Sequence, residues 1–290
     1  MVNLRQVRGF DIVNFLLLAF VAFASLFPFV HMASVALSSP EFVVRNDVGF
    51  WPRGLQWDAF SAAVDDPRLW VGYRNTLLYV TLGTAIAMTL TVVGAYSLSR
   101  KSLLFGKPIL LLVVFTLMFN GGMIPFYLVM RSYGLMDTIW AMVLPGAINT
   151  YNLIIMRTFF QGIPPEIEES GRIDGLSDYR LLTSIVLPLS KPAIMTVGLF
   201  YAVEIWNSFS GALLLLRDAN LYPLQLVIRN LVVVGQSGDV LETSAASGRK
   251  VVLESLKYAL ILLGSLPIIL VYPFIQKYFE QGALIGSVKG

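Results

Sequence analysis

The sequence contains no cysteine and only one histidine, His31, among its 290 residues. Without cysteine the chain forms no disulfide, no thiolate metal site and no cysteine nucleophile. A single histidine argues against a histidine-based zinc or haem site. His31 falls near the outer end of the first long apolar run, where we assign it no functional role.

Charged residues are also scarce. They make up 13% of the chain, about half the share in soluble globular domains, whereas 56% of the residues are hydrophobic. The net charge of +3 comes from 21 basic and 18 acidic residues. A nucleic-acid interface requires basic residues clustered on one face, and this small excess does not provide one. The composition therefore argues against a water-soluble fold.

The common nucleotide-binding and hydrolytic motifs are missing as well. The sequence has no Walker A pattern, no Gly-rich dinucleotide pattern and no nucleophile elbow. We therefore expect no ATP, cofactor or metal to be bound by this chain, and no hydrolytic reaction.

What the sequence has is long apolar runs. A bilayer core about 30 Å thick requires about 20 apolar residues per helix. Six runs meet this requirement: 12–40, 75–99, 108–130, 138–156, 192–216 and 258–276. The first is longer than the 7–15 apolar residues typical of a secretory signal, so we interpret it as a retained anchor. We predict an all-α, polytopic membrane bundle of six transmembrane helices.

Positive charge in the short loops indicates the orientation. Segment 100–107 carries Arg100, Lys101 and Lys107, whereas segment 131–137 carries only Arg131. The positive-inside rule places 100–107, and with it both termini, in the cytoplasm. We divide the chain into an amino-terminal tail, first transmembrane helix and external loop (1–72), a transmembrane domain (73–276) and a cytoplasmic tail (277–290).

The polar segment 161–192 is too charged to cross a membrane. Pro164 and Pro165 suit the start of a helix, and Gly175 suits a left-handed residue that ends it. Ser177 is expected to cap a second helix, which would run to Leu187 and end at Pro188.

This segment resembles the EAA loop of binding-protein-dependent ABC importer permeases. The matching residues are Glu169-Ser170-Gly171, then Gly175 after three residues and Ile185-Val186-Leu187-Pro188 after nine more. Ser170 and Gly171 replace the two alanines of the family pattern. The segments 206–209, 221–226 and 276–290 are similar to the carbohydrate, or maltose-type, branch. Segments 120–125 and 144–148 resemble a subgroup for uronate oligosaccharides such as alginate or pectin fragments.

The resemblance implies a non-catalytic permease of the bacterial inner membrane that forms half of an oligosaccharide pathway. Its partners would be a second permease, two ATPase subunits that hold ATP and Mg, and an external solute-binding protein. The loop between the fourth and fifth helices would act as the coupling helix. Its expected ATPase-docking residues are Glu168, Glu169, Ser170, Gly171, Asp174, Gly175 and Leu176. Gly171 and Gly175 are expected to permit close approach. Arg249 and Lys250 either help to dock the binding protein or belong to a solvated hairpin.

Several polar residues in the apolar runs are candidates for the pathway: Asn149, Asn152, Glu204, Trp206 and Asn207. An acidic residue in mid-membrane costs about 2.5–3.5 kcal/mol, so Glu204 requires a cavity, a partner or a proton. Asn207, three residues on, is a possible partner. Glu204 is either a pathway residue or a hydrogen-bonded packing group. For Trp206 we favour packing over sugar stacking, and for Asn120, Asn149 and Asn152 we favour joining helices over lining a pathway.

Two other classes of function remain as alternatives. An autonomous secondary transporter or channel would use ion-coupling carboxylates or broken helices in two matched halves, and the sequence offers only Glu204. An intramembrane enzyme would require paired catalytic residues inside the spans, and no such pair is visible.

Overall fold

The computed structural model describes residues 9–234 and 246–287, with side chains at 9–233, 253–273 and 276. Every regular element within these ranges is a helix, and they contain no β-strand. The all-α fold class is therefore confirmed. The chain divides into two compact units, one of residues 1–69 and 228–266 and the other of residues 70–227 and 267–290. Each unit is described by itself.

The first unit contains α1 (Gly9–Ala36), α2 (Pro40–Val44) and α3 (Asp58–Val64). The apolar side chains of α1 are exposed along most of its length, as expected for a helix in lipid. The segment after α1 folds back through polar contacts. Ser34 Oγ donates to the carbonyl of Phe50 at 2.6 Å, and the backbone N–H of Arg53 donates to Ser38 Oγ at 3.0 Å.

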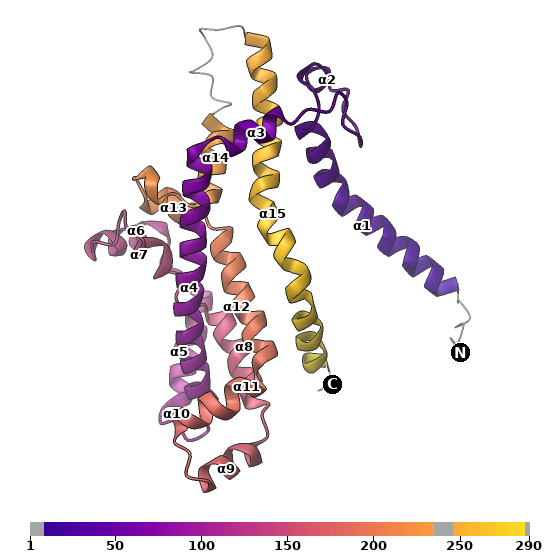
Figure 1. Cartoon of the computed structure of the whole chain (residues 1–290). Coiled ribbons are helices and arrows are strands. Elements are labelled where there is room, and N and C mark those ends of the chain that lie inside the picture. Colours follow the sequence, from indigo (N-terminus) through magenta and orange to yellow (C-terminus); the bar gives the residue numbers. More distant parts are fainter. Residues whose placement is uncertain (1–8, 235–245, 288–290) are drawn as a thin grey trace. The chain divides into compact units, whose positions relative to one another are not determined.

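The second unit is a helical bundle built around α4 (Pro67–Ser99), which begins in the first unit (Figure 1). Its other helices are α5 (Gly106–Met118), α6 (Met123–Ser132), α7 (Trp140–Val143), α8 (Thr150–Gln161), α9 (Pro165–Ile173), α10 (Asp178–Leu181), α11 (Leu187–Leu189), α12 (Lys191–Trp206) and α13 (Ser210–Leu215). A π-helical turn, Leu182–Val186, joins α10 to α11, and a 3₁₀ turn, Ala219–Leu221, follows α13. The helices α14 (Leu224–Val234) and α15 (Ala246–Ser287) each contribute to both units. Because α15 continues to Ser287, residues 277–287 are helical.

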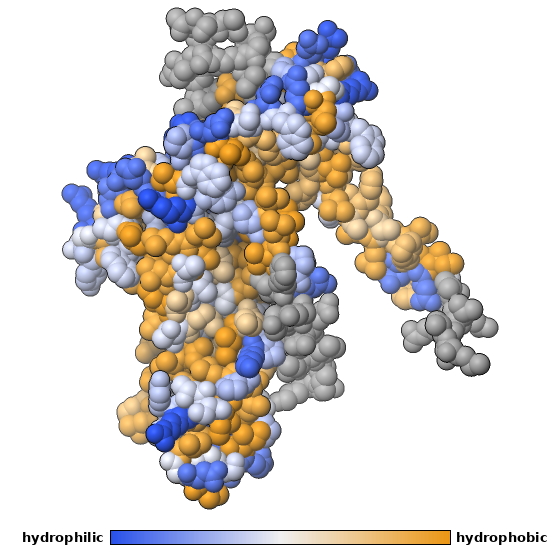
Figure 2. Space-filling view, in the orientation of Figure 1, coloured by the Kyte–Doolittle hydropathy of each residue, from blue (hydrophilic) through white to orange (hydrophobic). Residues whose placement is uncertain are grey.

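The apolar core of the bundle joins α4, α8 and α12. Ala87, Met156, Val197 and Tyr201 are all buried in it. Figure 2 shows hydrophobic residues over the middle of the bundle and hydrophilic residues around α9 and around α6 and α7. This pattern fits a bundle whose middle lies in lipid and whose ends reach water.

Three of the six predicted runs are single long helices, and three are interrupted. Gly9–Ala36, Pro67–Ser99 and Leu253–Pro273 are each long and apolar enough to cross a membrane. The third run breaks between α5 and α6, which differ in direction by 115°, because Gly122 takes a left-handed φ of 81°.

The fourth and fifth runs are also interrupted. Pro145 and Gly146 separate α7 from α8, and α8, with 12 residues, spans only about 18 Å. The fifth run ends as a helix at Trp206 and resumes at Ser210. Two pairs of helical segments are bent: α5 with α6, and 178–189 with α12. If each pair is counted as one span, the described residues hold five candidate spans rather than six.

A cluster of hydrogen bonds joins α4 to the segment 220–224. Asn75 Nδ2 donates to the carbonyls of Asn220 and Tyr222 at 2.7 and 3.1 Å, and Tyr79 Oη donates to that of Leu221 at 2.7 Å. The Leu224 N–H donates to Thr76 Oγ1 at 2.8 Å. These bonds satisfy backbone groups that lie next to the apolar core, where an unpaired group is costly.

We predict that Tyr79→Phe destabilises the purified protein by about 1–3 kcal/mol, because the carbonyl of the half-buried Leu221 loses its donor. Thermal unfolding in detergent measures the change. Thr81→Val is the matched control, since Thr81 Oγ1 bonds only to carbonyls of its own helix. Equal stability of Tyr79→Phe and Thr81→Val would contradict the prediction.

Candidate functional site: the surface helix and the central cavity

The helix α9 forms as the sequence predicts. Pro164 precedes it, Glu166 and Glu168 occupy its first turn, and Gly175 follows it with a φ of 79°. Carboxylates in the first turn favour the positive end of the helix dipole. Figure 1 shows α9 at one end of the second unit, beyond the ends of α4 and α5.

The second helix of the segment begins as predicted and ends differently. Ser177 caps α10, its side chain accepting from the Arg180 N–H at 3.4 Å. Pro188 does not end the helical path, because it lies in the first turn of α11, where its missing N–H is tolerated. The π-helical turn before it is closed by the bond from the Leu187 N–H to the Leu182 carbonyl. The chain bends by 86° only after Leu189.

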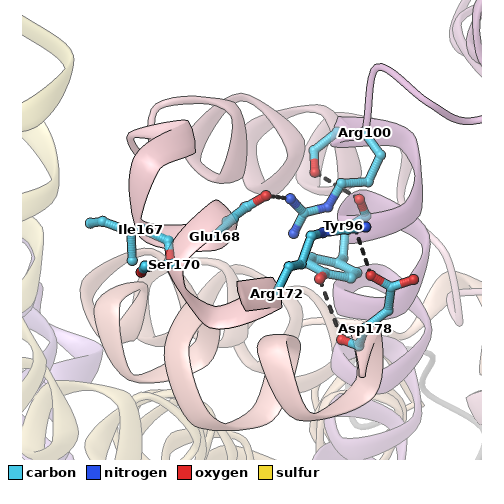
Figure 3. Close-up of polar contacts among 8 residues, drawn as sticks. Tyr96, Arg100, Ile167, Glu168, Ser170, Arg172 and Asp178 are labelled. Atoms are coloured by element: carbon cyan, nitrogen blue, oxygen red, sulfur yellow. Dashed lines mark hydrogen bonds and ion pairs between the residues drawn. The ribbon is translucent and has the colours of Figure 1, made fainter. Parts of the chain in front are cut away.

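An ion pair fixes α9 to the end of α4. Glu168 pairs with Arg100, whose guanidinium carbon lies 4.0 Å from the centre of the Tyr96 ring. Figure 3 shows Arg100 reaching from the end of α4 to Glu168 on α9. Both charged side chains are largely buried, at 17% and 16% exposure. Glu168, expected to dock on another subunit, is thus engaged inside this chain.

A second contact holds the far end of α9. Arg172 Nη2 donates to Asp178 Oδ1 at 2.7 Å, and Tyr96 Oη donates to the Asp178 carbonyl at 3.3 Å. Arg100 thus forms an ion pair with the first half of α9, and Arg172 joins the last turn of α9 to α10 (Figure 3). Two ion pairs within the chain thus hold α9, one largely buried and one exposed.

The two glycines of the motif have different roles. A Cβ on Gly171 would lie 2.6 Å from Leu181 Cδ2 and 3.0 Å from Ile185 Cδ1, so this glycine permits close approach between α9 and the following helical segment. A Cβ on Gly175 would meet nothing within 4 Å. Within this chain, the requirement at Gly175 is its left-handed backbone, which glycine adopts without strain.

The outer face of this segment exposes residues that the motif comparison missed. Glu169, Ser170 and Asp174 are exposed, as expected for docking residues, and Leu176 is half-buried. In addition, Ile173 is 86% exposed and Tyr179 75% exposed. Large apolar side chains at the polar end of a bundle favour contact with another protein. The sequence does not single them out, because Ile163, Ile167 and Leu176 in the same segment are apolar too.

A cavity of about 770 Å³ lies in the second unit among α6, α7, α12 and α13. Among the described residues that line it, Glu204 is the only charged one. Asn120, Tyr201 and Ser208 are polar residues of the same lining. The Glu204 carboxylate accepts from Asn149 Nδ2 at 3.3 Å. The predicted partner Asn207 is wrong, because its amide donates to the carbonyl of Val203 instead.

The other predicted pathway residues lie within the helical bundle. The Asn149 side chain caps α8 by accepting from the N–H groups of Tyr151 and Asn152, and its backbone N–H donates to Tyr201 Oη at 2.9 Å. Asn152 is buried. Trp206 is also buried and packs with the ring of Tyr73 at 6.4 Å between centroids. The side chains of Arg249 and Lys250 lie outside the described part of the chain.

A comparison with protein families decides which family this architecture represents. The family model described as the binding-protein-dependent transport system inner membrane component matches residues 10–284. The chain belongs to this permease family. It is therefore a membrane-embedded, non-catalytic permease subunit of the ABC importer type, and the alternatives of an autonomous transporter and an intramembrane enzyme are set aside.

Individual relatives of the permease are known from sequence and structure. It is 42% identical over 285 residues to the polygalacturonan/rhamnogalacturonan transport system permease protein YtcP of Bacillus subtilis (strain 168), covering 98% of this chain and 99% of the relative. It is 38% identical over 292 residues to protein LplC of the same organism, and the match covers 99% of this chain and 97% of LplC. The fold is also similar to a chain in the crystal structure of a bacterial ABC transporter involved in the import of the acidic polysaccharide alginate. The TM-score is 0.85 at 34% sequence identity, and the match covers 95% of this chain and 98% of the other.

The glycines of the permease yield the first prediction for this site. We expect Gly171→Val and Gly175→Val both to uncouple sugar uptake from ATP hydrolysis while membrane insertion stays normal, the former by a clash with Leu181 and the latter by backbone strain. Gly175→Asn is the matched variant, because asparagine adopts a positive φ. Uptake and ATPase rates measured at equal expression test this, and normal uptake by Gly171→Val would contradict it.

The ion pair yields a second prediction. Arg100→Glu and Glu168→Arg should each lower uptake several-fold, because each leaves a largely buried charge beside another of the same sign. The double variant, which restores opposite charges, should recover much of the lost rate. Glu166→Gln, on the exposed first turn of α9, is the control. Equal loss in the double variant and the single variants would show that the charges do not position α9.

Proposed function

We propose that this permease forms one half of the translocation pathway of an ATP-driven importer for an acidic, uronate-containing oligosaccharide. In this proposal α9 is the coupling helix, docked on one of two ATPase subunits that hold ATP and Mg. A second permease supplies the other half of the pathway, and an external binding protein delivers the sugar. The division at residues 72 and 276 then separates the first helix and the carboxyl-terminal segment from the transmembrane domain.

The proposed coupling role is supported by the way α9 is attached to the bundle and by the apolar residues exposed beside it. The inner face of α9 is fixed by Arg100 and Gly171, while Ile173 at its end and Tyr179 on α10 are exposed. A helix that is rigidly joined to the bundle and carries an exposed apolar face transmits a push or pull from another subunit. Rigid-body movement of packed helices is a common form of such switching.

The substrate class rests on a different observation. The relative at 42% identity is named for polygalacturonan and rhamnogalacturonan, and the structural neighbour belongs to an importer of alginate. All three polymers contain uronic acid units. We propose the bacterial inner membrane as the location, with both termini and α9 in the cytoplasm, which agrees with the basic residues of segment 100–107.

Reconstitution tests the proposed function. We expect proteoliposomes with both permeases, the ATPase subunits and the binding protein to hydrolyse ATP faster when trigalacturonate or an alginate trimer is added. Maltotriose, which has no carboxylate, is the matched sugar and should have no effect. Stimulation by maltotriose alone would refute the substrate class, and uptake without ATP would refute the coupled mechanism.

Ile173 provides a separate test of coupling. Ile173→Asp should lower the sugar-stimulated ATPase rate about tenfold or more, because it places a charge in a contact that we propose to be apolar. The complex should still assemble in the membrane. The control is Ile124→Asn, an exposed apolar position on α6, far from α9 (Figure 1). An unchanged rate in Ile173→Asp would contradict the proposed docking face.

A further inference from the structure

A second, smaller cavity of about 320 Å³ lies beside the central one in the second unit. Six residues line it: Tyr127, Arg131, Met136, Asp137, Leu215 and Arg217. Leu215 also lines the central cavity, so the two spaces are neighbours. The smaller cavity is formed by α6, α13 and the loops that follow them. Figure 1 shows these elements well away from α9, toward the other end of the unit.

The two arginines of this small cavity do not form close ion pairs within the described part of the chain. Both side chains are exposed, and neither Arg131 nor Arg217 forms an ion pair with any residue that the structure describes. Arg131 lies in the last turn of α6, and Arg217 lies two residues after the end of α13. Two guanidinium groups from distant parts of the sequence thus line one small space that holds a single carboxylate, that of Asp137.

The carboxylate of Asp137 hydrogen-bonds to the backbone rather than to either guanidinium, so the three charged groups of the cavity leave one positive charge in excess. Oδ1 accepts from the N–H groups of Arg217 and Asp218, both at 2.9 Å. The N–H of Asp137 in turn donates to the carbonyl of Leu215 at 3.0 Å. The hydrogen bonds from the N–H groups of Asp218 and Arg217 hold the pKa of Asp137 below its usual value, so it stays ionised at neutral pH.

These contacts show what Asp137 does for the cavity. It ties the loop after α6 to the residues after α13, which fixes the backbone from which the Arg217 side chain extends. Its φ of 58° is a conformation that few residues other than glycine, asparagine and aspartate adopt. The cavity is therefore a built feature in which the backbone at Arg217 is fixed and two guanidinium groups face a single carboxylate.

We infer that Arg131 and Arg217 form a binding subsite for the carboxylate of a uronate unit as the oligosaccharide enters the permease. A guanidinium binds a carboxylate through two parallel N–H···O bonds, which gives both strength and geometry. Tyr127 adds a half-buried ring of the kind that has an apolar face and a polar tip. The space is at the lower end of the volumes of ligand pockets and suits about one sugar unit.

The central cavity complements this subsite. Its only charged lining residue is Glu204, which repels a carboxylate and accepts hydrogen bonds from hydroxyl groups. A uronate oligomer is thus held by its acidic group at the arginine pair and by hydroxyl groups beside Glu204. The inference rests on the proposed substrate class, and it assigns the recognition of the acid to this chain.

The test uses the reconstituted transporter and two sugars that differ only in the carboxylate: trigalacturonate and its carboxyl-reduced form. Each sugar is supplied at a concentration that saturates the binding protein. We expect Arg131→Gln and Arg217→Gln each to lower the uptake of trigalacturonate about tenfold, in line with the loss of a charge-assisted hydrogen bond. Uptake of the reduced sugar should be unchanged. Arg131→Lys, which keeps the charge, should recover part of the rate.

Controls distinguish this inference from other roles of the arginines. Arg68→Gln removes an exposed arginine that is already paired with Asp66, and it should leave uptake of both sugars unchanged. An equal loss for both sugars would show a structural role. Weaker binding of the empty binding protein to Arg131→Gln vesicles would show a docking role. No loss for either sugar would show that the subsite is not used, and each of these results overturns the inference.

Failure of the proposed function has a different signature. If the unaltered transporter imports only the reduced sugar, the uronate substrate class is wrong whatever the variants do. If it imports trigalacturonate and the arginine variants do so equally well, the substrate class stands and the subsite is wrong.

Discussion

Backbone groups at helix ends must find hydrogen-bond partners inside the protein wherever lipid replaces water, and the second unit depends on this constraint. Its helices break several times, and side chains bond to the chain at the breaks. Asn149 caps α8 and bonds to Tyr201 through its own N–H. Thr76 accepts from the N–H of Leu224, and Asp137 accepts from the N–H groups after α13. Without these partners, the irregular segments would not be stable next to apolar surfaces.

The same breaks create the functional features. The bend between α5 and α6 and the interruption after α12 open the central cavity, and the junction at Asp137 holds the arginine pair beside it. The bend after Leu189 directs the chain from α11 into the bundle. At the other end, Arg100 and Gly171 fix α9 to α4 and to the segment that follows. The proposed coupling surface thus lies at one end of the unit, and the candidate sugar-binding residues lie toward the other.

Composition and local chemistry predicted much of this architecture. The scarcity of charge indicated a membrane bundle, and Pro165, Gly175 and Ser177 placed α9 and the turn after it within a residue or two. The breaks within the apolar runs were missed because hydropathy averages over Gly122, Pro145 and Gly146. Partners distant in sequence were also missed: nothing local to Glu168 or Glu204 points to Arg100 or Asn149. The outward direction of Ile173 depends on which face of α9 packs inward, and the sequence alone does not contain that information.

Site-specific cross-linking tests the central claim, that α9 couples this permease to an ATP-hydrolysing subunit. Because the chain has no cysteine, Ile173→Cys introduces its only thiol. A short cross-linker attached there in the assembled transporter should capture the ATPase subunit, as identified by mass spectrometry. The same linker on Trp51→Cys, an exposed position in the loop expected outside, should not capture it. Capture of the ATPase subunit from Trp51, or of none from Ile173 in a transporter that hydrolyses ATP, would contradict the account.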